Sequence, residues 1–503
     1  MAQGGLGVVL RRRWRQLRQG PVGVQVVAGV VVVAVVGGLI AVGLVAGARG
    51  SSSKTAVAAP SPTTSAPLAA GDSARGVTAD SINVVFPVID VAAIQAANGF
   101  ANSTDESYDE AIRVYVADIN AHGGINGRKI VAQVVKFNPS DDADMRAKCL
   151  SWTKDESVFA VVDAGAWHDD QQLCITQEGH TPLISSWTTV TDFANRGAPY
   201  LWWAGVDQGV LLRDLVPWAV AHQLIGPGVK FSIVASDRAS DTLAVNNYLK
   251  PALTAAGLTP VSTETINYNP QDNATAAAQA PSVVERLRAA GVTAVIPLMP
   301  LPAFLAYMQA ANSQQYYPKL VLSDYEQTIA IGLGMAESLF KNVLDGQLGM
   351  TYQTLGNSDD PRGYNLQPLS ADCFKTWIAA HPTPYPDADD PHGEVTIESQ
   401  GPIMTECQNI RLFAAAARAA GPNLTRKSFT DAMANLTNWP AAVYPVLSYG
   451  PNQHGGATQT RTVRIHVNDK AHNGCPLLIS GKPQGSCWLI VSDFGGGPPP
   501  PGY

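Results

Sequence analysis

One loop gathers side chains of the kinds that bind metal ions. Residues 386–394 (PDADDPHGE) contain Asp387, Asp389, Asp390, His392 and Glu394. Carboxylate oxygens suit calcium, but the spacing is not that of an EF-hand loop, so a solvated acidic loop is the favoured interpretation. The chain also has no GxSxG, HExxH or Walker A motif, and no spacing brings its scattered Ser, His and Asp residues together. We therefore predict no catalytic residue, no metal, no cofactor and no enzymatic activity.

Polar residues that follow two apolar segments are better candidates for binding. Residues 165–168 (GAWH) precede an expected helix, where free backbone N–H groups favour an anion, and residues 185–189 (SSWTT) supply hydroxyl donors. A buried ligand carboxylate needs such donors, and a buried ammonium group needs an acid, because unpaired buried charges are costly. The alternatives are that the Ser and Thr residues cap helices, that Trp167 and Trp187 belong to the core, and that His168 lies at the surface.

Charge is distributed unevenly along the 503 residues. The 34 basic and 41 acidic residues give a formal charge of −7, but residues 1–71 hold seven basic residues and no acidic one. The remainder therefore carries a net charge of −14. Such an acidic body lacks the basic face that nucleic-acid binding needs, so we predict no nucleic-acid partner. The low content of charged residues, 15%, beside 46% hydrophobic residues excludes a disordered chain.

The N-terminal region is predicted to be a membrane element. A basic stub (residues 1–20) precedes an apolar segment (21–48), and no charged residue lies between Arg18 and Arg49. This segment is long enough to cross a hydrocarbon layer about 30 Å thick. The arginines predict a single-pass plasma-membrane protein with a cytoplasmic N-terminus and an extracytoplasmic body. The alternative is a signal peptide cleaved after the small residues at 46–48, which gives a secreted protein; both interpretations export the body.

Six cysteines fit an exported body. They are Cys149, Cys174, Cys373, Cys407, Cys475 and Cys487, and none has zinc-ligand spacing. Proximity in the sequence favours the pairs Cys149–Cys174, Cys373–Cys407 and Cys475–Cys487. We expect these disulfides to stabilise the fold and not to carry redox chemistry.

The body alternates short apolar runs with amphipathic segments, between a Ser/Pro/Ala-rich linker (49–78) and a low-complexity tail (495–503). Runs typical of buried parallel strands lie at 82–86, 130–135, 158–162, 231–234, 292–298 and 320–322. Helices are expected from the Ser103-x-x-Glu106 capping box to Gly123, and at about 142–155, 169–179, 208–223, 241–256, 276–290 and 302–312. Repeated βα units predict an α/β fold of two doubly wound lobes, with ligand sites at the carboxyl ends of the strands.

The chain resembles the type I periplasmic solute-binding proteins, which include branched-chain amino acid receptors of ABC importers. The likeness begins with GVTADSINVVFPV (77–89) and AIRVYVADINAHGGINGRKI (111–130). It continues through VFAVVDAG (158–165), HTPLISSWTTVTDF (180–193) and PYLWWAGVDQG (199–209), and then through KFSIVASD (230–237), GVTAVIPLM (291–299) and LVLSDYEQ (320–327). It covers most of residues 77–350 and is faint beyond them.

The resemblance implies two lobes joined by three crossovers, which close on a small ligand by a hinge motion. The crossovers are expected near residues 204, 345 and 445. Lobe 1 would then comprise residues 79–204 and 345–445, and lobe 2 residues 205–344 and 446–494.

The resemblance also implies a set of ligand-binding residues. Ser185 to Thr189 match the family's donors to a ligand carboxylate, Asp207 matches a position that contributes to binding, and Asp324 matches an acid for the ammonium group. Asp207 has the alternative role of capping the helix that follows it. The full set of candidates is Ala166, Trp167, Ser185, Ser186, Trp187, Thr188, Thr189, Asp207, Ser240, Asp324 and Tyr325.

The sequence departs from the family at Ser240-Asp241. Relatives usually carry a Tyr-Gly pair there, and its Tyr contacts the ligand. Losing a ring and gaining an acid argues against a branched-chain amino acid and leaves open a more polar ligand. We therefore expect a membrane-anchored solute-binding protein that captures a small polar molecule, such as an amino acid, an amide or an organic acid, for an ABC permease. The alternative is a surface receptor or structural protein of this fold that no longer serves transport and acts through another membrane partner.

Overall fold

The fold is described from a computed structural model of the whole chain. The described residues are 74–90, 92–93, 105–162, 167, 169–269, 272–329, 340–354, 368–381, 397–467 and 486–497. Several predicted features lie outside them, namely the basic stub (1–20), the membrane segment (21–48), most of the linker (49–78), Ser103 of the capping box, the acidic loop (386–394) and Cys475. Among the described residues, no helix combines the length and the apolar character needed to cross a membrane.

Lobe 1 is built on a five-stranded parallel sheet. In spatial order its strands are β2 (Lys129–Phe137), β1 (Ser81–Ile89), β3 (Ala160–Val162), β4 (Leu183–Ser185) and β5 (Leu201–Trp203). The three short strands β3, β4 and β5 are buried at every position. Continuous burial of this kind arises when helices cover both faces of a parallel sheet.

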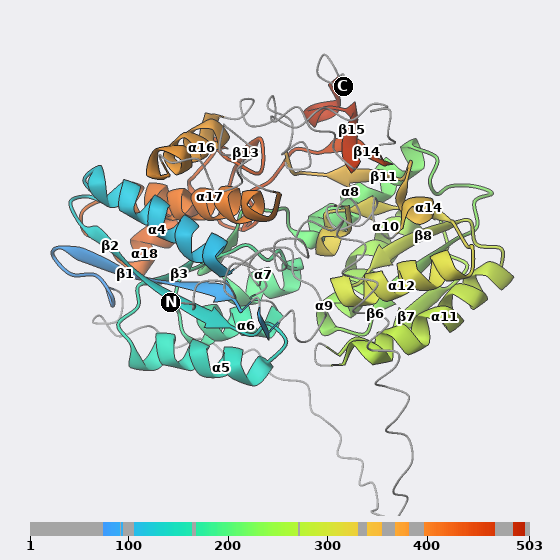
Figure 1. Ribbon diagram of the computed structural model, residues 1–503, viewed down its shortest axis with the longest axis horizontal. Helices are drawn as coiled ribbons and strands as arrows, with labels where there is room; N and C mark the ends of the chain where they lie inside the picture. Colours follow the sequence, from blue (N-terminus) through green and yellow to red (C-terminus); the bar gives the residue numbers. More distant parts are fainter. Residues whose placement is uncertain are drawn as a thin grey trace, which may run out of the picture. The chain divides into compact units, whose positions relative to one another are not determined.

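Helices from two distant parts of the chain cover this sheet (Figure 1). The first part supplies α4 (Asp105–Ala121), α5 (Asp142–Leu150), α6 (Asp169–Leu173) and α7 (Thr191–Gly197), and the second supplies α16 (Pro368–Ala380), α17 (Ile397–Ala419) and α18 (Arg426–Ala434). The Tyr115 hydroxyl of α4 donates to the Cys373 carbonyl of α16 at 3.0 Å. Arg426 of α18 donates to the carbonyls of Val158 and His180. Lobe 1 is therefore completed by residues that follow lobe 2 in the sequence.

In lobe 2 the described residues form two four-stranded sheets. The strands of the first sheet, in spatial order, are β7 (Thr263–Ile266), β6 (Phe231–Ser236), β8 (Ala294–Leu298) and β9 (Lys319–Leu320). The strands of the second sheet, in spatial order, are β10 (Leu322–Ser323), β11 (Leu348–Thr351), β14 (Arg461–Val467) and β15 (Ser486–Ser492). The first is parallel throughout, whereas β14 is antiparallel to both of its neighbours. The described part of this lobe contains the helices α8 (Gln208–Ala221), α9 (Ala239–Leu243), α10 (Lys250–Ala255), α11 (Asn273–Ala289), α12 (Leu301–Ser313) and α14 (Lys341–Leu344).

The expected elements occur where the periodicity is clear. Helical structure covers each of the six later helix ranges, although the segments 151–155, 174–178 and 244–249 are π-helical. The strand expected at 320–322 is instead divided between β9 and β10. Val321 separates them, and its N–H donates to the Val295 carbonyl at 2.9 Å. A run of three apolar residues does not reveal such a break, because its burial is the same in one strand or two.

The described residues bear on where the chain passes between the lobes. It leaves β5 at residues 204–207, near the expected position. β11 pairs with β10 and β14, so the second passage follows Thr351 rather than residue 345. Residues 446–457 still pack on lobe 1, since the Trp203 N–H donates to the His454 carbonyl and the Gly456 N–H donates to the Trp203 carbonyl. The third passage therefore precedes β14, beyond residue 445.

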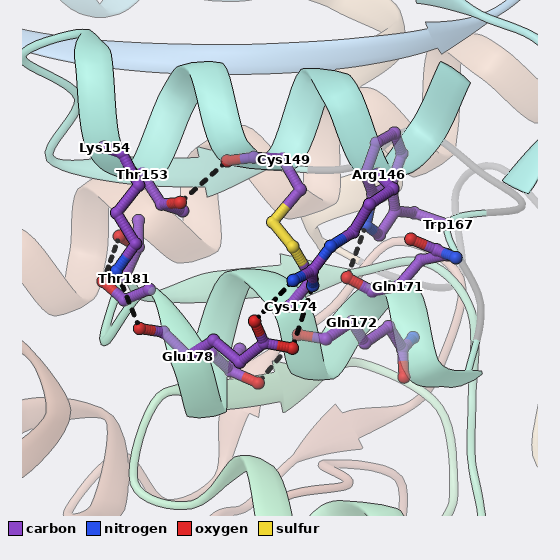
Figure 2. The surroundings of a disulfide bond; sticks show 12 residues. Arg146, Cys149, Thr153, Lys154, Trp167, Gln171, Gln172, Cys174, Glu178 and Thr181 are labelled. Carbon is purple, nitrogen blue, oxygen red and sulfur yellow. Dashed lines mark hydrogen bonds and ion pairs between the residues drawn. A yellow bond between two sulfur atoms is a disulfide. The ribbon is translucent and has the colours of Figure 1, made fainter. Parts of the chain in front are cut away.

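Two of the three expected disulfides are confirmed. Cys149 pairs with Cys174, and Cys373 pairs with Cys407. Figure 2 shows the first of these, which joins α5 to the helical segment that follows α6. Beside it Arg146 forms two hydrogen bonds of 2.8 and 2.7 Å with the Glu178 carboxylate. The third pair stays a prediction, because Cys475 lies outside the described residues.

Candidate functional site

Gln172 of α6 positions the polar loop that follows β4. Its Nε2 donates to the Ser185 hydroxyl and to the Trp187 carbonyl, both at 3.0 Å. The Ser185 hydroxyl also accepts from the Trp187 N–H. Gln172 and Ser185 are completely buried. The Ser185 hydroxyl thus accepts two hydrogen bonds inside lobe 1.

The rest of this loop is joined to α17 and α8. The Ser186 hydroxyl accepts from Asn409 Nδ2 at 2.8 Å. The Thr188 hydroxyl accepts from Gln208 Nε2 at 3.2 Å, and the Thr189 carbonyl accepts from the Gln208 N–H. Thr189 is completely buried, whereas Ser186, Trp187 and Thr188 are partly exposed. The loop therefore keeps three partly exposed residues that are fixed by neighbouring helices.

Trp167 lies in the core of lobe 1. It is fully buried, its ring centroid lies 4.9 Å from that of Phe137 and 5.0 Å from that of Trp152, and its Nε1 donates to the Gln171 carbonyl (Figure 2). These contacts favour the core alternative for this residue. Ala166 and His168 lie outside the described residues.

Asp207 caps a helix. Its carboxylate accepts from the Val210 N–H of α8 at 3.0 Å and from the Thr191 hydroxyl at 2.6 Å. Burial raises the pKa of this carboxyl, and the hydrogen bonds that it accepts oppose the rise. These partners favour the capping alternative over ligand binding.

Asp324 faces the start of the second passage between the lobes. Its carboxylate accepts from the Thr351 hydroxyl at 2.8 Å and from the Tyr352 N–H at 2.7 Å. Burial raises the pKa of Asp324 to about 6. Both oxygens therefore have partners inside lobe 2, which leaves this carboxylate poorly placed to accept from a ligand ammonium group.

Tyr325 belongs to a buried polar cluster that the sequence did not reveal. Its hydroxyl donates to Asp241 Oδ1 at 2.6 Å. Arg238 donates to both oxygens of Asp241 and, at 2.5 Å, to Glu326 Oε1. The Arg238 side chain is 13% exposed, those of Asp241 and Glu326 0% and 1%. The signal in the sequence was that charged residues follow two buried strands closely, Arg238 and Asp241 after β6 and Asp324 and Glu326 after β10.

Ser240 connects this cluster to lobe 1. Its hydroxyl donates to Asp169 Oδ2 at 2.8 Å across 71 positions of sequence. Asp169 begins α6, the same helix whose Gln172 positions the loop after β4. Asp169 also acts electrostatically on Arg238 and on Glu326. The structure therefore brings Ser240 of the predicted set to the contact between the lobes, close to the Ser185–Thr189 loop.

Two members of the cluster, Glu326 and Arg238, have pKa values shifted from their ordinary values. Burial raises the pKa of Glu326 to about 7, and the neighbouring Asp241 carboxylate adds to the rise while Arg238 opposes it. The carboxylates of Asp241 and Glu326 hold the pKa of Arg238 well above its ordinary value despite burial. The guanidinium thus stays charged, and Glu326 changes charge near neutral pH.

Comparison with known proteins assigns the fold to a family. A family model described as a periplasmic binding protein matches residues 88–348. The chain belongs to the type I periplasmic binding protein family. Members of this family are solute-binding proteins of ABC transporters and form a non-enzymatic class. No match is found among curated proteins.

Solved structures of other periplasmic binding proteins share the fold at low sequence identity. A fatty acid ABC transporter substrate-binding protein from Thermomonospora curvata is 16% identical, covers 84% of this chain and 95% of its own, and has a TM-score of 0.59. A solute-binding protein from Rhodopseudomonas palustris BisB5, in complex with 3,4-dihydroxybenzoic acid, is 15% identical, with coverages of 84% and 99% and a TM-score of 0.58. A branched-chain amino acid ABC transporter protein from Thermus thermophilus with bound valine is 13% identical, with coverages of 82% and 96% and a TM-score of 0.56. These similarities concern the fold of this periplasmic binding protein.

Proposed function

We propose that this periplasmic binding protein captures a small polar ligand where its two lobes meet and delivers it to an ABC permease. The observation that carries the proposal is the contact between Ser240 and Asp169, because it joins the two lobes with polar side chains beside the partly exposed Ser186–Thr188 loop. In proteins that close by a hinge, ligands that contact both lobes stabilise the closed state. The similar structures named above bind molecules as different as valine and dihydroxybenzoic acid, so they support a small ligand and not one compound.

We further propose that the body acts outside the plasma membrane, tethered by the uncleaved segment 21–48. The basic residues before this segment and the two disulfides support this arrangement, because disulfides persist in oxidising compartments. Mass spectrometry of the membrane fraction tests it. An intact N-terminal segment in the mature protein supports the anchor, and a mature chain that begins after residue 48 shows cleavage instead.

A thermal-shift screen of the purified full-length chain tests ligand binding. The library contains amines, amino acids, amides and organic acids. A ligand at a hundredfold excess over its Kd adds about 2.7 kcal/mol to the free energy of unfolding, which raises the melting temperature by several degrees. A flat response to every class would contradict solute binding and favour the alternative, a receptor or structural protein of the same fold.

A further inference from the structure

The described residues at the contact between the lobes hold more negative than positive charge. Asp169, Asp241 and Glu326 contribute three carboxylates, and Arg238 contributes the guanidinium that lies among them. The Asp241 carboxylate has no capacity for a further donor, because both of its oxygens already accept hydrogen bonds, from Ser236, Tyr325 and Arg238. Arg238 in turn is already paired with two carboxylates. Its charge is therefore not available to a ligand carboxylate.

Two buried residues in this region carry a carboxylate or amide oxygen without a hydrogen-bond donor, and the Thr189 hydroxyl of the neighbouring loop also lacks a partner. Glu326 Oε2 in lobe 2 is one, although Oε1 of the same carboxylate accepts from Arg238. Gln172 Oε1 in lobe 1 is the other, although its Nε2 donates twice. Gln172 is 0% exposed and Glu326 is 4% exposed. An unsatisfied buried polar atom costs about 1–3 kcal/mol, so such atoms are rare unless a ligand or water satisfies them.

Hydrogen bonds and positions adjacent in the chain connect Gln172 to Glu326. Gln172 lies one helical turn after Asp169, Asp169 accepts from Ser240, and Ser240 adjoins Asp241. Arg238 then links Asp241 to Glu326. The amide orientation of Gln172 follows from its partners, because the Trp187 carbonyl can only accept. Gln172 Oε1 and Glu326 Oε2, one from each lobe, are thus both acceptors, and Glu326 belongs to a cluster with an excess of carboxylates.

We propose that the ligand is a small organic cation, of the primary ammonium, amidinium or guanidinium class and without a carboxylate, and that Gln172 Oε1 and Glu326 Oε2 accept its hydrogen bonds. The inference rests on the proposed function and specifies its ligand class. Such a cation supplies the missing donors to both lobes and offsets the negative charge of the cluster. An organic anion would instead face carboxylates and acceptors that it cannot satisfy. Glu326, and not Asp324, thus receives the positive group.

The thermal-shift screen of the full-length chain separates this inference from the proposed function. The probes are agmatine, putrescine and benzamidine as cations, leucine and γ-aminobutyrate as zwitterions, and succinate and benzoate as anions. The expected result is stabilisation by at least one cation and by neither anion. If zwitterions or anions stabilise the protein and the cations do not, the inference is wrong and solute binding stands. If no probe and no member of the larger library stabilises it, both proposals fail.

Titration calorimetry of variants tests the assignment of Glu326. With the best cation as probe, Glu326→Gln is expected to weaken binding by about tenfold or more, because it removes a buried charge that pairs with the ligand. Asp169→Asn, which keeps an acceptor for Ser240, should weaken binding by a smaller factor. The matched control is Glu178→Gln, which removes the same charge from an ion pair with Arg146 whose side chains are 42% and 50% exposed.

Each calorimetric outcome decides the assignment. Equal affinities of Glu326→Gln and Glu178→Gln would overturn the role of Glu326. If Glu326→Gln does not fold, Asp169→Asn carries the comparison with the same control, and unchanged affinity in that variant overturns the proposal.

Discussion

The Ser240 hydroxyl donates a hydrogen bond of 2.8 Å to the Asp169 carboxylate, and this contact joins lobe 2 to lobe 1. Ser240 follows β6, and Asp169 begins α6 in the other lobe. Ser240 is 1% exposed and Asp169 is partly exposed, so the contact is partly buried. A partly buried hydrogen bond between two lobes favours the state in which they touch, and its removal should shift the balance toward separation.

We predict that Ser240→Ala increases the population of separated lobes. Loss of one such hydrogen bond costs about 1 kcal/mol, which corresponds to a change of about fivefold in the opening equilibrium. Hydrogen–deuterium exchange of residues 169–173 and 239–243 should therefore quicken by about this factor in the ligand-free protein. The control is Ser262→Ala, whose hydroxyl pairs with Ser232 inside lobe 2. Equal exchange in the wild type and in Ser240→Ala would show that the contact does not regulate opening.

We predict that Asp324 stabilises the fold without contributing to ligand affinity. Asp324→Ala leaves the Thr351 hydroxyl and the Tyr352 N–H without an acceptor, which lowers the free energy of unfolding by about 2 kcal/mol. Asp324→Asn keeps one acceptor oxygen and should cost less. The affinity for the best cation should stay within about threefold of the wild type, a difference below 1 kcal/mol. Denaturant unfolding measures the loss of stability, and calorimetry measures the affinity. A loss of affinity comparable to that of Glu326→Gln would instead assign Asp324 as the acid that pairs with the ligand.

The raised pKa of Glu326, about 7, predicts a pH dependence of stability. The folded protein binds this proton more tightly than the unfolded chain, so this group's contribution to stability is present at low pH and falls as pH rises to 7 and beyond. Between pH 6 and pH 8 the change is on the order of 1 kcal/mol. It is measured as the difference between the pH profiles of the wild type and Glu326→Gln, because partly exposed His222 and buried His454, whose pKa values are lowered by desolvation, change stability in the opposite direction. Parallel profiles would contradict the raised pKa.

Cation binding should depend on pH with the opposite sign. Arg238, Asp241 and Asp169 act electrostatically on Glu326, whose own pKa of about 7 lies near neutrality. Ionised Glu326 attracts the ligand, so the affinity should fall by about tenfold from pH 8 to pH 6. Calorimetry at the two pH values measures this change with agmatine, whose guanidinium stays charged throughout. The dependence should disappear in Glu326→Gln, and its persistence there would assign it to another group.

We predict that each of the two observed disulfides stabilises the body. The Cys149–Cys174 and Cys373–Cys407 bonds close loops of 25 and 34 residues, for which the chain-entropy model gives about 3–4 kcal/mol each. Replacement of Cys149 and Cys174 by Ala, measured by denaturant unfolding, should lower the free energy of unfolding by this amount at most. Arg146→Gln, which removes an exposed neighbouring ion pair, is the control and should change stability by less than about 1 kcal/mol. Equal stability of the double Ala variant and the wild type would contradict the prediction.

The strands and helices of the body could be predicted because their signals are local. The run at 82–86 and the periodic helix that ends before Gly123 report burial through nearest neighbours in the sequence. The positions at which the chain passes between the lobes were harder to predict from the sequence. Residues 446–457 pack against β5, which lies more than 240 positions earlier, and no local pattern records that pairing. Similarly, Trp167 and Asp207 carry the right residue types for a ligand site, but packing and capping decide their partners.

The sequence by itself determined the two-lobed α/β class, the two disulfide pairs observed here and the acidic character of the body, because each depends on composition, periodicity or proximity along the chain. It indicated the family through the resemblance of its segments to the type I periplasmic binding proteins. Only the tertiary structure decided which acid keeps an oxygen without a donor. Asp324 and Glu326 are two residues apart and the sequence singled out Asp324, yet Thr351 and Tyr352 satisfy that carboxylate, while Glu326 keeps an acceptor without a partner. The reason is that the partners of a buried carboxylate come from distant segments, and the fold alone brings those segments together.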